Sequence, residues 1–177
     1  MRCKSVRDRP SIRKAVSEDS AAVLGVLRAA FAPYRSAYTT AAYRETVLTA
    51  ESFEKRRQQM TVFVALGGEG KIVGTVSYEA NDSIGHIRGM AVHPRWHGAR
   101  VAHALLAQVE TELQGLQCVA VTLETTRPLV RAIRFYERNG YAATGRSRQW
   151  QGMELLQYKK SILLGTSQSG HGGTEVP

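Results

Sequence analysis

The sequence lacks the features that mark membrane-spanning, secreted and disulfide-bonded proteins. None of its apolar runs approaches the ~20 residues that a membrane-spanning helix requires, and its N-terminal segment is basic and polar, unlike a secretory signal. It has two cysteines, Cys3 and Cys118, which lie far apart and without the spacing of metal ligands. We therefore expect a cytoplasmic protein with no membrane partner, no disulfide framework and no bound metal.

Acidic residues are scarce relative to basic ones. Lys and Arg number 24 against 15 Asp and Glu, which gives a formal net charge of +9. This excess favours an anionic partner, and it does so equally for a nucleic acid, an anionic lipid or a phosphorylated cofactor. A basic nucleic-acid-binding domain is one hypothesis, but the sequence contains no recognisable nucleic-acid-reading motif, so charge alone does not favour it.

Length and composition predict one folded domain. A chain of 177 residues with 43% hydrophobic residues can bury a substantial core. We expect a disordered basic leader over residues 1–10, a globular domain over residues 11–164, and a flexible tail rich in Gly, Ser and Thr over residues 165–177. Any activity is expected in the middle segment.

Hydrophobic periodicity predicts both helices and strands. Apolar residues at helical spacing predict helices over 17–33, 51–59, 98–114 and 128–139. Runs of β-branched and aromatic residues predict strands over 11–16, 61–66, 72–80, 86–93, 118–126, 141–150 and 152–159. The order βααβββαβαββ indicates an α/β (α+β) domain, with a mixed, mostly antiparallel sheet of about seven strands flanked by about four helices.

A glycine-containing turn connects one of these strands to the strongest predicted helix. The segment from Val92 to Ala102 reads VHPRWHGARVA. A helix N-terminus presents free backbone N–H groups to an anion, and the small residues Gly98 and Ala102 let phosphate oxygens approach the backbone. The segment therefore favours a pyrophosphate site, and the alternative is an ordinary helix start after a strand.

The same segment resembles motif A of the GNAT superfamily of N-acetyltransferases, and residues 132–141 resemble its motif B helix. The similarity covers nearly the whole chain, from Ser11 to about Leu164. Two positions depart from the family pattern: His97 stands where Gln or Arg is usual, and Arg100 stands where a second glycine is usual.

The resemblance implies that acetyl-CoA is the cosubstrate. Its pyrophosphate is expected on the backbone of the turn and the first helical residues, which are His97, Gly98, Ala99, Arg100, Val101 and Ala102. Its pantetheine arm is expected along the preceding strand, at Met90, Ala91 and Val92, and Tyr136 is expected to touch the same cosubstrate.

The resemblance and the side-chain chemistry together indicate catalytic candidates. Tyr136 matches the motif B tyrosine that protonates the leaving thiolate, although its place on an apolar helix face also suits a packing role. His86, with an ordinary pKa of about 6.5, is the candidate general base or else a solvated turn residue. Glu79 and Glu124 are alternative bases or ion-pair partners. Gly89 predicts a bulge that frees an N–H group for the thioester carbonyl.

The resemblance implies that the acceptor lies over the region from Phe31 to Gln59, facing the loop between the last two strands. Tyr34, Tyr38 and Tyr43 are the candidate substrate-binding residues, in a connection predicted as an aromatic loop. Because the region is rich in arginine and offers no acidic funnel, the sequence favours a small, non-polycationic primary amine, acetylated by direct attack in a ternary complex. A catalytically degenerate acyl-CoA sensor remains the alternative, and a homodimer is left open.

Overall fold

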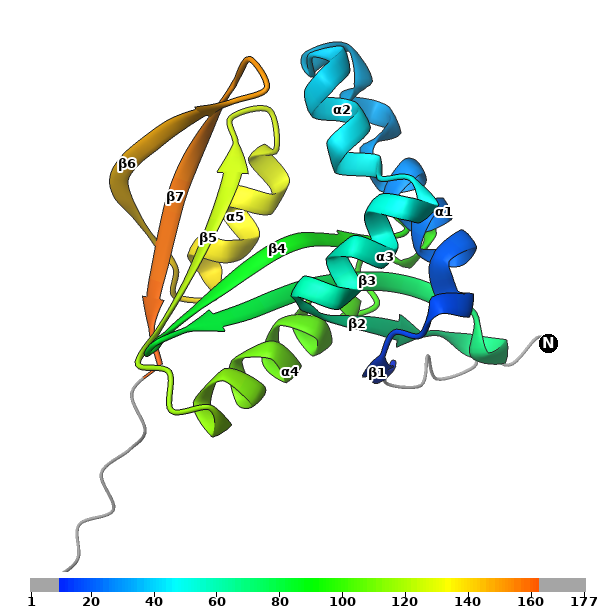
Figure 1. Ribbon diagram of the computed structural model, residues 1–177, viewed down its shortest axis with the longest axis horizontal. Coiled ribbons are helices and arrows are strands. Elements are labelled where there is room, and N and C mark those ends of the chain that lie inside the picture. Colours follow the sequence, from blue (N-terminus) through cyan, green and yellow to red (C-terminus); the bar gives the residue numbers. More distant parts are fainter. Residues whose placement is uncertain (1–9, 163–177) are drawn as a thin grey trace, which may run out of the picture.

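The computed structural model of this protein describes residues 10–162, so the expected leader and tail lie outside the described residues apart from Pro10 (Figure 1). Seven strands form one sheet in the order β1-β2-β3-β4-β5-β7-β6. Their bounds are β1 Ser11–Lys14, β2 Thr61–Leu66, β3 Ile72–Asn81, β4 Ile84–Val92, β5 Ala120–Thr126, β6 Ala142–Trp150 and β7 Met153–Ser161. All neighbouring strands are antiparallel except β4 and β5, which confirms the expected mixed sheet.

Five α-helices cover the sheet in the described part of the chain. They are α1 Ser20–Phe31, α2 Thr40–Val47, α3 Ala50–Gln59, α4 Val101–Gly115 and α5 Val130–Arg138. Helices α1 and α3 pack on one face of the central strands, and α4 packs on the opposite face (Figure 1). The fold therefore has two helical layers around the sheet.

Helix α2 corrects the prediction of a plain aromatic loop. Its first turn is capped by Thr39, whose hydroxyl accepts a hydrogen bond from the backbone N–H of Ala42 at 3.1 Å. The helix has eight residues, too few to display an apolar repeat over several turns, so periodicity did not predict it.

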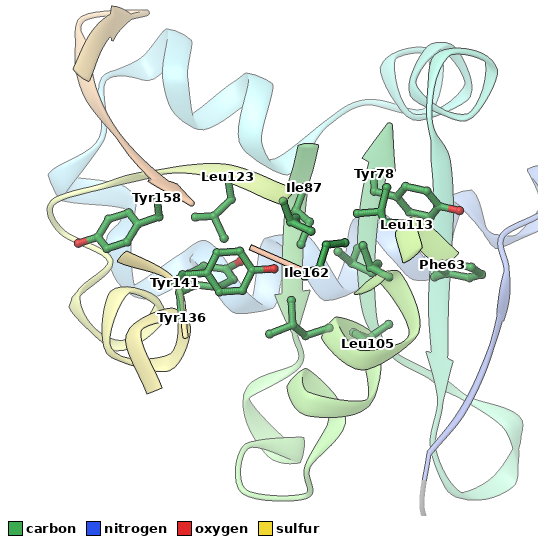
Figure 2. Close-up of a cluster of buried hydrophobic side chains, with 14 of the residues drawn as sticks. Phe63, Tyr78, Ile87, Leu105, Leu113, Leu123, Tyr136, Tyr141, Tyr158 and Ile162 are labelled. Atoms are coloured by element: carbon green, nitrogen blue, oxygen red, sulfur yellow. The ribbon is translucent and has the colours of Figure 1, made fainter. Parts of the chain in front are cut away.

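Side chains of the central strands alternate between the two layers. On β2, Phe63 and Ala65 join the apolar cluster against α4, whereas Val62 and Val64 join the cluster under α1 and α3. Figure 2 shows part of the first cluster, with side chains from strands and from α4 and α5. The same alternation decides which residues of β4 and β5 face the α1 and α3 layer.

Strands β4 and β5 pair over only part of their length. The parallel register runs from Ile84 opposite Ala120 to Ile87 opposite Leu123, although both strands continue beyond these pairs. Figure 1 shows the two strands diverging from that paired end. The carboxyl ends of the two central strands are therefore free to border a ligand site.

The predicted irregularity at Gly89 is confirmed. Gly89 has φ of +67°, and the β3–β4 register shifts between Thr75 and Ser77, so that Ala91 and Arg88 are the flanking partners. A bulge of this kind leaves backbone groups outside the ladder, and a residue without Cβ adopts the required φ most easily. The bulge lies where β4 has already left β5.

Candidate active site

A cleft of about 310 Å³ opens where β4 and β5 separate. Residues 86–90 of β4 and 123–126 of β5 line it, together with side chains from α5 on one side and from α2 and α3 on the other. Several residues predicted from the sequence meet on its walls, namely Tyr38, Glu79, His86, Met90, Glu124 and Tyr136. The tertiary structure thus brings the catalytic candidates to one place.

The turn before α4 presents unpaired backbone donors. Within residues 10–162, the N–H groups of Gly98, Arg100, Val101, Ala102 and His103 have no hydrogen-bond acceptor, whereas the N–H of Ala104 already bonds the Arg100 carbonyl at 3.0 Å. A Cβ placed on Gly98 would meet open space. Free donors, open space and a helix N-terminus fit the pyrophosphate of a coenzyme A molecule.

Arg100 has the backbone conformation for which a glycine is the natural residue. Its φ of 58° and ψ of 12° are left-handed, and it caps α4 without a side-chain hydrogen bond. This conformation destabilises a non-glycine residue by about 1 kcal/mol. The side chain of Arg100 is exposed, so the departure from the family pattern costs strain but leaves the N–H groups available.

The strand before this turn offers its backbone rather than its side chains. Ala91 is buried in the cluster under α1, and Val92 packs against the α4 cluster, whereas Met90 lines the cleft. Only backbone groups of Ala91 and Val92 therefore remain for a pantetheine arm.

Helix α5 places a cation beside the turn before α4, and the sequence did not single this residue out. The Nη1 group of Arg131 donates a hydrogen bond to Nδ1 of His97 at 2.8 Å. Burial lowers the pKa of His97, and the adjacent Arg131 lowers this pKa further, so the imidazole is neutral at neutral pH. His103 meets the Phe135 ring edge to face at 5.0 Å, which joins the start of α4 to α5.

Tyr136 holds a protonated hydroxyl at the cleft. Its side chain is buried, with the rings of Phe135 and Tyr141 packed edge to face at 5.5 and 5.7 Å. Burial raises the pKa of the Tyr136 phenol, and within the described residues its hydroxyl has no hydrogen-bond partner. Tyr136 therefore both packs and carries a proton that is free to be donated into the cleft.

The hydrogen bonds around His86 determine which ring nitrogen carries its proton. The Thr122 hydroxyl donates to the Gly85 carbonyl at 3.1 Å, so its single proton is already used. Its contact of 3.1 Å with Nδ1 of His86 then requires the imidazole to donate. Nε2 of His86 is left as an acceptor, which is the form that a general base needs.

The environment of His86 also favours its neutral form. Burial lowers its pKa, and this effect outweighs the opposing influence of Glu124 and Glu79. Glu79 lies directly across the β3–β4 ladder from His86 and has no hydrogen bond or ion pair within the described residues. It is a free carboxylate beside the candidate base.

Glu124 has a structural partner instead. Arg148 of β6 binds both of its carboxylate oxygens, through Nε at 2.7 Å and through Nη2. Both carboxylate oxygens of Glu124 therefore already accept hydrogen bonds from the guanidinium. Among the two glutamates, Glu79 is the better alternative to His86.

Only one of the three tyrosines predicted to bind the acceptor lines the cleft. The Tyr38 hydroxyl shares a hydrogen bond of 2.7 Å with Thr126 of β5 and so connects the helical layer to the far wall. Tyr34 packs edge to face on Phe31 at 6.4 Å, and the Arg35 guanidinium stacks on the Tyr43 ring at 4.7 Å. The prediction for Tyr34 and Tyr43 is not supported by their positions.

The expected meeting of α2 with the loop between the last two strands is present. Thr39 donates its hydroxyl to the Gln151 carbonyl at 2.6 Å, and the Gln151 side chain donates to Glu45. A Cβ on Gly152 would lie 3.1 Å from the Thr39 methyl group. This contact joins α2 to the loop between β6 and β7.

Sequence reasoning missed several polar residues in the cleft or in contact with its lining. Thr122 fixes the His86 tautomer, and strand alternation would have placed it on the same face as Glu124. Thr125 lines the cleft with a buried hydroxyl that has no partner among the described residues. Arg56 and Arg88 also line the cleft. A lone threonine or arginine carries no sequence signal for such a place.

Comparison with known proteins agrees with this geometry. The model of the acetyltransferase (GNAT) family matches residues 24–141, so the chain belongs to this family. Acyl transfer from a coenzyme A cosubstrate is the activity that membership supports. No helix within residues 10–162 has the length and apolar character to span a membrane.

Solved structures share the fold at low sequence identity. The PaiA N-acetyltransferase from Thermoplasma acidophilum in complex with coenzyme A is 16% identical with a TM-score of 0.72, over 86% of this chain and 98% of that one. A GCN5-related N-acetyltransferase from Rhodopseudomonas palustris is 20% identical with a TM-score of 0.72, over 90% and 99%. The ribosomal-protein-S18-alanine N-acetyltransferase from Escherichia coli is 16% identical with a TM-score of 0.69, over 90% and 97%.

Proposed function

We propose that this protein transfers the acetyl group of acetyl-CoA to the primary amine of a small, non-polycationic acceptor, by direct attack in a ternary complex. The observation that carries the proposal is the pairing of two groups on one cleft. His86 has a free Nε2 and a lowered pKa, and Tyr136 has a raised pKa and a hydroxyl without a partner among the described residues. Together they supply a base and an acid for amine acylation.

The binding step uses the cofactor side of the cleft. Bound acetyl-CoA would supply an activated thioester. The free N–H groups from Gly98 to His103 hold its pyrophosphate, and the exposed charge of Arg100 adds to the same field. Backbone groups of residues 90–92 hold the pantetheine arm, and the bulge at Gly89 provides a backbone N–H that polarises the thioester carbonyl.

The chemical step moves one acyl group and two protons. The amine nitrogen forms a bond to the carbonyl carbon as the bond from that carbon to sulfur breaks. Nε2 of His86 takes the proton that the amine gives up, and the Tyr136 hydroxyl gives its proton to the departing sulfur. Solvent then returns a proton to Tyr136 and removes one from His86, so the protein is unchanged.

The degenerate sensor is separated from the enzyme by one assay in two stages. Millimolar acetyl-CoA should first raise the melting temperature, because a ligand that binds only the folded state stabilises it. Release of free coenzyme A is then measured with a panel of amino acids, arylalkylamines, spermidine and kanamycin. Release with no member of the panel, after binding has been shown, would favour the sensor. A clear preference for spermidine or kanamycin would contradict the non-polycationic acceptor.

A further inference from the structure

Two arginines of the cleft form no ion pair within the described residues. Arg56 on α3 is half-buried and Arg88 on β4 is exposed, and both line the cleft. Within residues 10–162 neither side chain has a hydrogen bond or an ion pair. The third arginine of the cleft, Arg148, differs from these two because it forms an ion pair with Glu124.

The Arg56 side chain reaches the part of β4 that carries Arg88. A Cβ built on Gly89 would overlap Nη1 of Arg56, so this guanidinium lies directly against the bulge. Arg88 is opposite Ser77 in the ladder, and the Ser77 hydroxyl is a neighbour of that same point on Gly89. Both charges are therefore on the α1 and α3 face of the sheet, where His86 also lies.

The electrostatics of this pair favour a bound anion. Burial and the neighbouring charge of Arg88 together lower the pKa of Arg56 to about 10, although Glu45 partly opposes the change. Arg56 stays charged at neutral pH, so its desolvation and its repulsion by Arg88 are only partly offset in the free protein. An anion placed between them would offset both costs.

The geometry also matches the spacing of a bifunctional acceptor. Arg88 follows His86 by two residues on the same strand face, so their Cα atoms lie about 7 Å apart. Glu79, across the ladder from His86, adds a negative charge at the amine end. A ligand with an amine at one end and an anion at the other would meet complementary charge at both ends.

We propose that Arg56 and Arg88 bind the carboxylate of the acceptor, which makes the substrate class an amino acid or a similarly short amino-carboxylate. The inference rests on the proposed function, because it places the amine at His86. A carboxylate is favoured because a planar guanidinium fork donates two parallel hydrogen bonds to its two oxygens. Arg56 and Arg88 are then specificity-determining residues, and neither moves a proton.

The test compares each L-amino acid with its own carboxamide, which has the same amine but no negative charge. We expect kcat/KM for the preferred amino acid to exceed that for its amide at least about tenfold. Arg56→Gln and Arg88→Gln should each lower kcat/KM for the amino acid by about 10- to 100-fold, mainly through KM, and leave the amide nearly unchanged. Arg56→Lys should be intermediate, because it keeps the charge and loses the fork.

Arg28→Gln is the matched control. It removes one positive charge from an exposed position of α1, and Arg28 lines neither the cleft nor the adjoining hollow that Arg56 and Arg88 share. It should behave as the wild type with both members of a pair. Melting temperatures of all variants establish that they fold, and Arg88→Gln changes an exposed residue, so the proposal does not depend on the half-buried position alone.

Three outcomes would overturn the inference: equal losses on the amino acid and the amide, a preference for amides, or a preference for taurine or 2-aminoethylphosphonate. If no amine is acetylated, the proposed function fails while the anion site is still decided by calorimetry on the protein saturated with coenzyme A. Binding of an amino acid but not its amide, lost in Arg56→Gln, would support the site. Absence of binding by both members of every pair would refute it.

Discussion

The two halves of the cleft differ in whether backbone groups or side chains form them. The proposed cofactor half consists of backbone N–H groups at the start of α4 and along the bulged end of β4, with small side chains beside them. The proposed acceptor half consists of charged and aromatic side chains that α2, α3, β3, β4 and β6 bring together. One half depends on chain conformation, and the other depends on side-chain identity.

This difference explains how much sequence change each half can accept. Arg100 and His97 depart from the family pattern, yet the N–H groups next to them remain unpaired within the described residues. A backbone site survives such changes as long as the chain keeps its path. A site made of side chains can change its ligand when one residue changes, so we expect the proposed acceptor half to determine specificity.

The largest expected effect comes from placing a charge in the backbone-built half. Gly98→Asp puts a carboxylate into the open space that the pyrophosphate would occupy. Like charges about 4 Å apart near a protein surface repel by about 4 kcal/mol, which corresponds to about a 10³-fold loss of acetyl-CoA affinity. Calorimetry measures this loss directly.

Gly98→Asn is the control for that variant. It imposes the same cost at φ of +81° with no charge, so affinity should fall much less. Equal losses in the two variants would mean that backbone conformation, and not an anion, is the sensitive feature of the turn.

Tyr136→Phe should give the next largest effect. Removing the hydroxyl takes away the proton source for the leaving thiolate, so kcat should fall by about 10²-fold with little change in acetyl-CoA affinity. Tyr141→Phe is the control, because Tyr141 is buried in the same cluster but donates its hydroxyl to Glu110 at 3.0 Å. If both variants keep wild-type turnover, Tyr136 is a packing residue only.

Substitution of His86 tests the acceptor half through pH. Because burial lowers the pKa of His86, the acidic limb of kcat/KM should have its midpoint below about 6.5. His86→Gln should remove this limb and lower turnover at pH 7 about tenfold, with Glu79 or water as the remaining base. Thr122→Val, which removes the acceptor for Nδ1–H, should have a smaller effect of the same kind. A limb that persists in His86→Gln would assign the base role elsewhere.

The same lowered pKa has a consequence for stability. The folded protein favours neutral His86, whereas the unfolded chain binds a proton there below about pH 6.5. The free energy of unfolding is therefore fully retained above that pH and falls as the pH is lowered below it. The wild type should therefore lose free energy of unfolding relative to His86→Gln between pH 6.5 and 5. Chemical denaturation at several pH values measures the difference, and parallel curves would contradict it.

The smallest expected effect is a gain in stability from Arg100→Gly. Glycine adopts φ of 58° without the strain that arginine has there, but it loses more backbone entropy on folding. The net increase in the free energy of unfolding should be about 0.5 kcal/mol. Arg100→Ala removes the same charge and keeps the strain, so it should not stabilise. A thermal melt distinguishes the two, and equal melting temperatures would show that the conformation is not strained.

Much of the fold followed from local patterns. All seven strands and four of the five helices were predicted, because strands alternate and long helices repeat their apolar residues. The bulge at Gly89 followed from a glycine inside a strand pattern. Helix α2 was missed, since it is short and is stabilised by the Thr39 cap and by contacts with the loop at Gln151.

The sequence by itself determined the family, the order of elements and the residues that motif spacing marks, including Gly98 and Tyr136. These features depend on residues that are close together in the chain, so the sequence shows them directly. Tertiary structure alone decided that Arg148 binds Glu124 and that Tyr38 lines the cleft, whereas Tyr34 and Tyr43 do not. It also placed Arg56 and Arg88 on one face of the sheet, where neither has a hydrogen bond or ion pair among residues 10–162. Each of these outcomes depends on groups that are far apart in sequence and meet only when the sheet and its helices pack, so no local pattern could specify them.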